Sequence, residues 1–315
     1  MGKLRRDSWN LGLRAALLLG AVACASTGTA GKSAPAPSAA ARPESGARGS
    51  LLIVGGGPIP DALLERFVTL AGGRSARIVV FPMSSEDPDA GIELTGDFRK
   101  LGANAERIVL THEQADTDAA ADRLTGVTGI WFGGGDQSRL TAALRGTKTE
   151  NAIHARYLAG AVVGGTSAGA AVMSTPMITG DEKKPGGDRP LAKDSPDAWI
   201  TIARDDVVTA GGFDLLPGAI VDQHFVRRRR NNRLLSTVLE HPDRIGVGID
   251  ESTALEVGPD GSWRVLGASV AVVFDARNAR ITPADAKVLG TEGVRLHVLP
   301  AGSRFDPRSG EAKLP

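Results

Sequence analysis

The chain has 315 residues, of which 37 are Lys or Arg, 36 are Asp or Glu and 42% are hydrophobic. This mixture is typical of a globular protein and excludes a fully disordered chain, while a single cysteine excludes a disulfide framework or a Cys-rich zinc site. A net charge of +1 gives no reason to expect nucleic acid as a partner.

The N-terminal segment indicates export. Three basic residues, Lys3, Arg5 and Arg6, precede an apolar run at 15–23. This run is too short to span a bilayer and has the length of the hydrophobic region of a signal peptide. It ends in small residues before Cys24, which resembles a bacterial lipobox and predicts a lipid on that cysteine. The alternative is a plain secretory signal that is cleaved at a nearby small residue.

Three segments follow from this interpretation. We expect a signal peptide at 1–24, a disordered linker at 25–50 and one folded domain at 51–315. The linker is rich in Ala, Ser, Pro, Thr and Gly, and such sequence cannot bury enough apolar surface to order itself. The protein is therefore expected to be secreted, and anchored by its lipid to a membrane of the bacterial cell envelope or surface.

Short apolar runs alternate with helical patterns along the domain. Buried strands are predicted at 51–54, 78–81, 108–110, 129–132 and 161–163, and helices at 61–70, 93–101 and 116–124, with further helical sequence up to residue 158. The last part is strand-rich, with strands predicted at 254–257, 263–266, 269–274 and 294–299. Short strands separated by helices predict an α/β fold, a mostly parallel sheet covered on both faces.

The strongest motif is a Gly-x-Ser-x-Gly sequence, Gly165-Thr166-Ser167-Ala168-Gly169, between a predicted strand and a helical start. A sharp turn from strand to helix exposes the serine oxygen above the sheet, and it requires small neighbours. Ser167 is therefore our candidate nucleophile, with the Ala168 N–H as a donor to an oxyanion. The alternative is a glycine-rich turn that only packs or binds an anion.

Two further glycine-rich turns end predicted strands. The turn at 55–57 is followed by Pro58 and lacks a Lys-Ser/Thr pair, so it is not a phosphate-binding P-loop. The turn at 133–137 offers the backbone N–H groups of Gly134 and Gly135 as oxyanion donors, and Gln137 as a ligand for polar substrate groups. Ligands of open α/β sheets bind beyond the carboxyl ends of the strands, so we expect these turns to face one crevice.

A catalytic serine needs a base, and His224 is the best placed of the five histidines because it separates an apolar strand from a run of arginines. The nearby arginines include Arg228, Arg230 and Arg233. A solvated basic face or a nucleic-acid patch is the alternative, but residues 51–315 hold 30 basic against 34 acidic groups, and aromatic residues are few. Carboxylate recognition by guanidinium groups fits better.

The third member of a serine triad is an acid. The candidates are Asp181, Glu182, Asp222, Asp250 and Glu251. Spacing along the chain does not choose among them, because the members of a triad meet in space.

Taken together, these motifs resemble the cyanophycinase branch of the S51 serine peptidases, relatives of aspartyl dipeptidase E. The matching sequences are GGGDQ at 133–137, GGTSAGA at 164–170, DQHF at 222–225 with the three arginines, and GIDESTA at 248–254. The resemblance implies a flavodoxin-like, class I glutamine amidotransferase-like three-layer sandwich with a strand-rich C-terminal part.

The resemblance also implies site residues. It assigns Ser167 as nucleophile, His224 as base and an acid after the serine turn, for which we expect Glu182. The substrate site is implied to contain Gln137, Asp222, Gln223, Arg228, Arg230 and Arg233. The implied substrate is cyanophycin, a poly-aspartate with arginine on each side chain, which is cut at β-aspartyl linkages into β-Asp-Arg dipeptides. No metal or organic cofactor is implied, and members of the family are commonly homodimers.

Two other interpretations stay open at this point. An α/β-hydrolase esterase shares the Gly-x-Ser-x-Gly sequence, but its histidine follows the last strand, where only His297 is available. A tethered binding protein for acidic ligands would keep the pocket and the arginines without turnover.

Overall fold

The computed structural model describes residues 49–183 and 200–315. The predicted signal peptide, the lipidation site Cys24 and the linker up to residue 48 lie outside these residues. Within them, no helix is long and apolar enough to cross a membrane.

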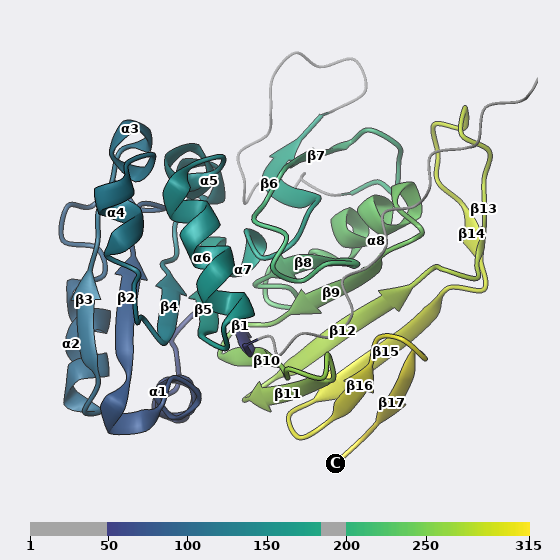
Figure 1. Cartoon of the computed structure of the whole chain (residues 1–315). Helices are drawn as coiled ribbons and strands as arrows, with labels where there is room; N and C mark the ends of the chain where they lie inside the picture. Colours follow the sequence, from purple (N-terminus) through teal and green to yellow (C-terminus); the bar gives the residue numbers. More distant parts are fainter. Residues whose placement is uncertain (1–48, 184–199) are drawn as a thin grey trace, which may run out of the picture. The chain divides into compact units, whose positions relative to one another are not determined.

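The largest element is a nine-stranded sheet in the order β17-β16-β11-β10-β1-β5-β4-β2-β3 (Figure 1). Five neighbouring strands are parallel to one another, namely β1 (Leu51–Val54), β5 (Val162–Thr166), β4 (Gly129–Phe132), β2 (Arg77–Phe81) and β3 (Asn104–Arg107). The other four pair antiparallel, namely β10 (Thr253–Val257), β11 (Trp263–Gly267), β16 (Arg304–Asp306) and β17 (Glu311–Lys313). The strands β1 to β5 therefore form a parallel half of the sheet, and the strands β10, β11, β16 and β17 extend it as an antiparallel half.

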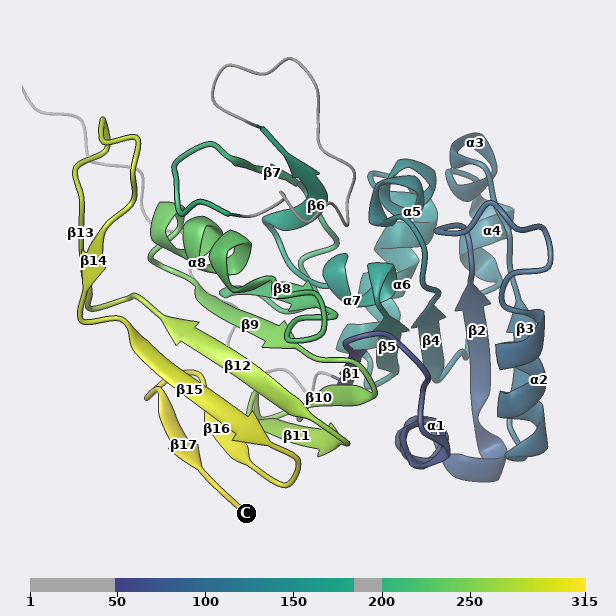
Figure 2. The same ribbon diagram turned by 180° about the vertical axis from the view of Figure 1, so that it is seen from behind.

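Helices cover both faces of the parallel part of the sheet (Figure 2). Alternating side chains of the parallel strands face these two layers. Leu52 and Val54 pack with α1 (Asp61–Leu70) and α2 (Ile92–Lys100). Leu51 and Ile53 belong to the core on the other side. That side is covered by α3 (His112–Ala115), α4 (Asp118–Asp122), α5 (Gln137–Leu144), α6 (Lys148–Leu158) and the short α7 (Ala168–Ala171). The predicted three-layer arrangement is thereby confirmed.

A second sheet has the order β15-β12-β9-β8. Its strands are β8 (Ala219–Gln223), β9 (Ile245–Ile249), β12 (Val270–Asp275) and β15 (Arg295–Pro300), and β8 runs parallel to β9. One face shares its core with the antiparallel half of the first sheet, and the other packs on α8 (Asn231–Glu240). Two small pairs complete the described strands, β6 (Met177–Glu182) with β7 (Val207–Ala210) and β13 (Arg280–Ile281) with β14 (Thr291–Glu292).

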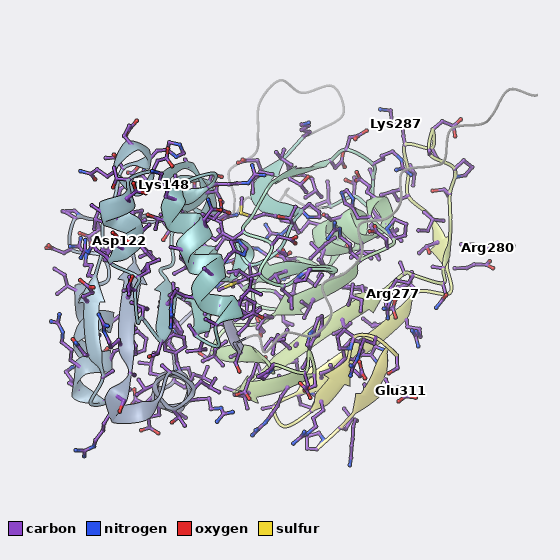
Figure 3. All side chains as sticks on the ribbon, in the orientation of Figure 1. Asp122, Lys148, Arg277, Arg280, Lys287 and Glu311 are labelled. Carbon is purple, nitrogen blue, oxygen red and sulfur yellow. The ribbon has the colours of Figure 1, made fainter. Side chains whose placement is uncertain are left out.

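Many charged side chains, including those labelled in Figure 3, lie at the periphery of this folded unit. Lys148, Arg280 and Glu311 are examples, and the Arg280 side chain is 81% exposed. The main departure from the predicted elements is the third strand. It lies at Asn104–Arg107 instead of 108–110, because an edge strand needs little apolar sequence.

Candidate active site

Ser167 occupies a strained turn between β5 and α7. Its backbone has φ 55° and ψ −109°, a conformation that side-chain-bearing residues rarely adopt. Gly165 and Gly169 permit this turn, since a Cβ on Gly165 would lie 2.5 Å from the carbonyl oxygen of Gly169, and one on Gly169 would meet the carbonyl of Phe132. The Ser167 N–H donates to the carbonyl of Val54 at 3.1 Å, which fixes the turn against β1.

His224 meets this serine. Its Nε2 lies 2.8 Å from the Ser167 Oγ, and the imidazole is buried. The residue follows β8 directly and has φ 46°. Its N–H donates to the carbonyl of Gly55 at 2.6 Å, and the turn at 55–57 covers the ring. The first glycine-rich turn, which had no assigned role in the sequence, thus supports the histidine.

The carboxylate on the other side of the imidazole is Glu251. Its Oε1 lies 2.6 Å from the His224 Nδ1. This corrects our expectation for Glu182, which lies buried on β6, paired in register with Val207 of β7. Glu251 follows β9, the parallel neighbour of β8, so the two strands deliver His224 and Glu251 to the same edge.

Burial and nearby charges lower the pKa of His224 below its usual 6.5. Desolvation is the largest cause, because burial disfavours the charged imidazolium. The positive charges of Arg228 and Arg230 lower the pKa further, while the hydrogen bond to Glu251 opposes this shift. The imidazole is therefore neutral near pH 7, as a proton acceptor must be.

Four of the predicted substrate ligands lie in buried polar contacts. Asp222 accepts two hydrogen bonds from the guanidinium of Arg233, and both side chains are 1% exposed. Arg230 donates to the side-chain oxygen of Gln223 at 2.7 Å and to its carbonyl at 2.8 Å. These contacts brace the segment that carries His224, and the role of all four residues in substrate binding stays a prediction. Arg228 differs because it is exposed, and its N–H donates to the His224 carbonyl at 2.9 Å.

Gln137 also points inward. It begins α5 and is 4% exposed, and its amide nitrogen donates to the carbonyls of Ile178 and Thr179 at 2.8 and 2.5 Å. It therefore ties α5 to β6.

The predicted oxyanion donors lie next to the serine. Ala168 is the first residue of α7, and a Cβ on Gly134 would lie 3.6 Å from the Ser167 Cβ. The Ser84 hydroxyl donates to the carbonyl of Gly134 at 2.8 Å. In a trans peptide the next N–H points opposite to that carbonyl, so this bond fixes the direction of the Gly135 N–H.

The histidine that meets Ser167 is His224 and not His297, the base that the esterase alternative requires. His297 lies on β15, and its ring packs edge-on against Phe305, with 5.3 Å between the ring centroids. Its Nε2 has no hydrogen-bond partner in the described part of the chain. Residues 49–183 and 200–315 contain no group of three or more His, Cys, Asp or Glu that could hold a metal ion.

Comparisons with known proteins agree with the family that the sequence motifs resemble. The model of "Peptidase family S51" matches residues 51–263. A cyanophycinase from Synechococcus elongatus is 35% identical over 280 residues, which covers 85% of this chain and 82% of the relative. Another, from Geminocystis herdmanii (strain PCC 6308), is 32% identical over 273 residues, which covers 83% and 95%.

A solved structure supports the fold. The crystal structure of a peptidase from an acI-B1 Actinobacterium aligns with a TM-score of 0.59 at 21% identity, over 84% of this chain and 98% of that one. At this identity the likeness concerns the architecture alone.

Proposed function

Because the chain belongs to peptidase family S51, we propose that it is a serine exopeptidase that hydrolyses the aspartate backbone of cyanophycin and releases β-Asp-Arg dipeptides. This product keeps the β-linkage to arginine intact, so the bond that is cut is the peptide bond between neighbouring aspartates and not the β-aspartyl linkage that we expected. The observation that carries this proposal is the hydrogen-bonded row of Ser167, His224 and Glu251. The substrate in this proposal is inferred from the cyanophycinases that resemble the chain over most of its length.

In this mechanism the Ser167 Oγ attacks the carbonyl carbon of the backbone peptide bond between two aspartates. The Nε2 of His224 accepts the serine proton and later donates it to the leaving amine. Glu251 accepts a hydrogen bond from Nδ1–H, which fixes the tautomer and stabilises the imidazolium that forms. Water then attacks the acyl-enzyme with the same histidine as base, and the serine is released.

The negative charge that develops on the carbonyl oxygen requires fixed donors. We assign this role to the N–H groups of Ala168 and of the turn at Gly134 and Gly135, which border the serine. The hydroxyl of Ser84 is a positioning group in this scheme, since it holds the Gly134 carbonyl.

The positive surface after His224 supports an anionic substrate. Arg227, Arg228 and Arg229 are exposed, and each arginine of cyanophycin carries a free carboxylate. A guanidinium binds a carboxylate with two parallel hydrogen bonds, so Arg228 is our candidate for this contact.

The test is product analysis with an active-site probe. The purified protein is incubated with insoluble cyanophycin, β-Asp-Arg oligomers and ordinary α-peptides, and the products are identified by mass. We expect β-Asp-Arg from the first two and no cleavage of the third. Ser167→Ala should abolish both cleavage and labelling by a fluorophosphonate. Equal labelling of wild type and Ser167→Ala would exclude the assigned nucleophile.

We further propose that the protein is exported and lipid-anchored through Cys24. At the cell surface it would have access to a polymer that is too large to be imported. The support is the basic start and apolar run before a cysteine of lipobox character. Labelling of cells with an alkyne fatty acid should mark the wild type and not Cys24→Ser. Labelling of both would contradict the anchor, and release of unlabelled wild type would favour the plain secretory signal.

A further inference from the structure

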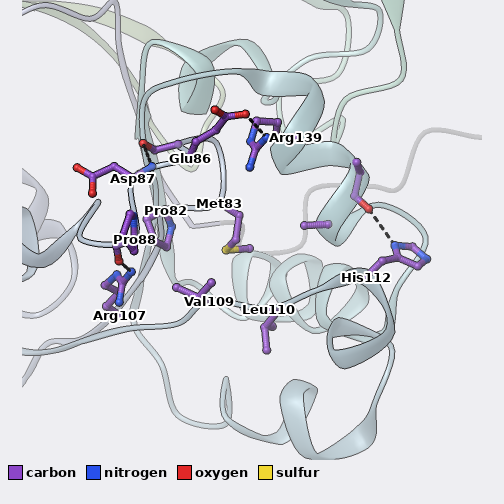
Figure 4. Close-up of a pocket in the computed structure, with 13 residues that line it drawn as sticks. Pro82, Met83, Glu86, Asp87, Pro88, Arg107, Val109, Leu110, His112 and Arg139 are labelled. Atoms are coloured by element: carbon purple, nitrogen blue, oxygen red, sulfur yellow. Dashed lines mark hydrogen bonds and ion pairs between the residues drawn. The ribbon is translucent and has the colours of Figure 1, made fainter.

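A cavity of about 510 Å³ opens beyond the carboxyl ends of β2 and β3, beside α5 (Figure 4). This volume lies within the range of pockets that hold small ligands. The cavity is formed by the loop after β2, the segment after β3 and one face of α5. None of the residues assigned to catalysis above lines it.

A short chain of contacts between residues links the wall of the cavity to the serine turn. Gly134 borders Ser167, and the Gly134 carbonyl accepts the hydroxyl of Ser84 at 2.8 Å. The neighbours of Ser84 on both sides, Met83 and Ser85, line the cavity. It therefore occupies the same edge of the sheet as Ser167, two strands away from β5.

The lining combines an apolar interior with both signs of charge at its edge. Met83, Val109 and Leu110 supply the apolar part, and Val109 is 53% exposed. Two exposed carboxylates, Glu86 and Asp87, stand at the edge. Arg139 of α5 adds a guanidinium, whose Nη1 lies 2.7 Å from the Oε1 of Glu86 (Figure 4).

We propose that this cavity is a subsite for an arginyl branch of the substrate, on a repeat next to the cleaved linkage. An arginine that is joined through its amine keeps a three-carbon stem, a guanidinium and a free carboxylate. The stem fits the apolar wall, the guanidinium pairs with Glu86 and Asp87, and the carboxylate pairs with Arg139. The choice of ligand rests on the proposed function, whereas the site itself does not involve the catalytic residues.

The first test measures binding without turnover. The chain has four methionines, and Met83 alone among those of the described residues lines the cavity, while Met173 and Met177 are fully buried elsewhere. The full chain with Ser167→Ala, labelled with ¹³C at the methionine methyl groups, is titrated with Nα-acetyl-L-arginine. We expect a saturable shift of the Met83 signal, assigned with Met83→Leu, and unchanged signals of the other two.

Two controls make this titration specific. Glu86→Gln combined with Asp87→Asn should weaken binding by about tenfold, because neutral amides replace the charged partners. Asp89→Asn removes a carboxylate of the same loop that does not line the cavity and should leave binding unchanged. A linear, unsaturable shift, or equal affinity for Nα-acetyl-L-citrulline, which lacks the guanidinium charge, would overturn the proposal.

The second test places the cavity in the reaction. Wild type is compared on (β-Asp-Arg)₃ and on analogues with citrulline in place of one arginine at a time. One analogue should show a KM raised by about tenfold in wild type and by much less in the double variant. Equal citrulline effects in both proteins would refute the subsite. If wild type cleaves none of these oligomers while Met83 still titrates with arginine, the proposed function fails and the binding site stands.

Discussion

Gly56 offers the most direct test of how His224, the proposed catalytic base, is held. A Cβ built on this glycine would lie 2.9 Å from the His224 Cδ2 and closer still to Cε1 and Nε2. Ordinary contacts begin near 3.4 Å, so Gly56→Ala must move the imidazole or the turn by roughly 1 Å. A misplacement of about 1 Å costs about 100-fold in rate, and we expect a loss of kcat of that size.

The substitution also strains the backbone, because Gly56 has φ +104°. That strain costs about 1–2 kcal/mol of folding free energy by itself. Gly72→Ala is the matched control. Gly72 has φ +108°, and the nearest atom to a built Cβ is 3.9 Å away, so this variant carries the strain without the contact to the imidazole.

The assay is kcat on β-Asp-Arg oligomers, together with the rate of fluorophosphonate labelling, which does not depend on the natural substrate. Both variants should lose similar stability in urea unfolding, and only Gly56→Ala should lose kcat and labelling rate. The reasoning is refuted if Gly56→Ala is as active as Gly72→Ala, since the covering turn would then have no part in holding the ring.

The remaining predictions concern the acid, the pH dependence and the buried ion pair. Glu251→Gln should lower kcat by about 10³–10⁴-fold, because it no longer holds the imidazole in its tautomer, and Glu182→Gln should lose far less; the reverse order in steady-state assays would return the triad to Glu182. Activity should fall as the pH drops through the lowered pKa of His224, and Arg228→Gln should raise that pKa and move the acid limb of kcat/KM to higher pH; an unmoved limb would show that this charge does not act on the ring. Asp222→Asn leaves its buried guanidinium partner without a counter-charge and should cost about 3–5 kcal/mol in unfolding free energy, whereas a change below about 1 kcal/mol would contradict the buried pair.

Local patterns predict most of the parallel half of the fold because most strands there contain a short, buried apolar run. Leu51–Val54 and Gly129–Phe132 are buried at every position. The third strand is different: Asn104–Arg107 is polar, and only Ala105 is fully covered, because the strand lies at the sheet edge. Such a strand has no apolar run of its own, so the apolar residues at 108–110 that follow it predict a strand in the wrong place.

The strand β9 was missed for another reason. Its sequence IGVGI contains two glycines, which weaken a strand pattern. In the structure a Cβ on Gly246 would collide with Val238 of α8, and one on Gly248 would collide with the ring of Phe225. These glycines are required by close packing against α8 and Phe225, and this requirement is evident only from the folded structure.

The site was predictable to the extent that its chemistry is local. The sharp turn that carries Ser167 is encoded within five residues, and His224 follows an apolar strand directly. The acid is not local. Glu251 is 27 residues from His224 and reaches it only because β8 and β9 are parallel neighbours. The sequence around Glu251 does not indicate that these two strands pair.

The same topology places the active site between two sheets. Ser167 extends from β5 of the nine-stranded sheet, whereas His224 and Glu251 extend from the four-stranded sheet. The glycine turn at 55–57 joins them, since Gly55 accepts the N–H of His224 and Gly56 accepts that of Ser252 at 2.9 Å. The proposed proton path from Ser167 to the imidazole of His224 therefore joins groups from two sheets, and its geometry depends on the core that the sheets share as much as on the proposed catalytic residues.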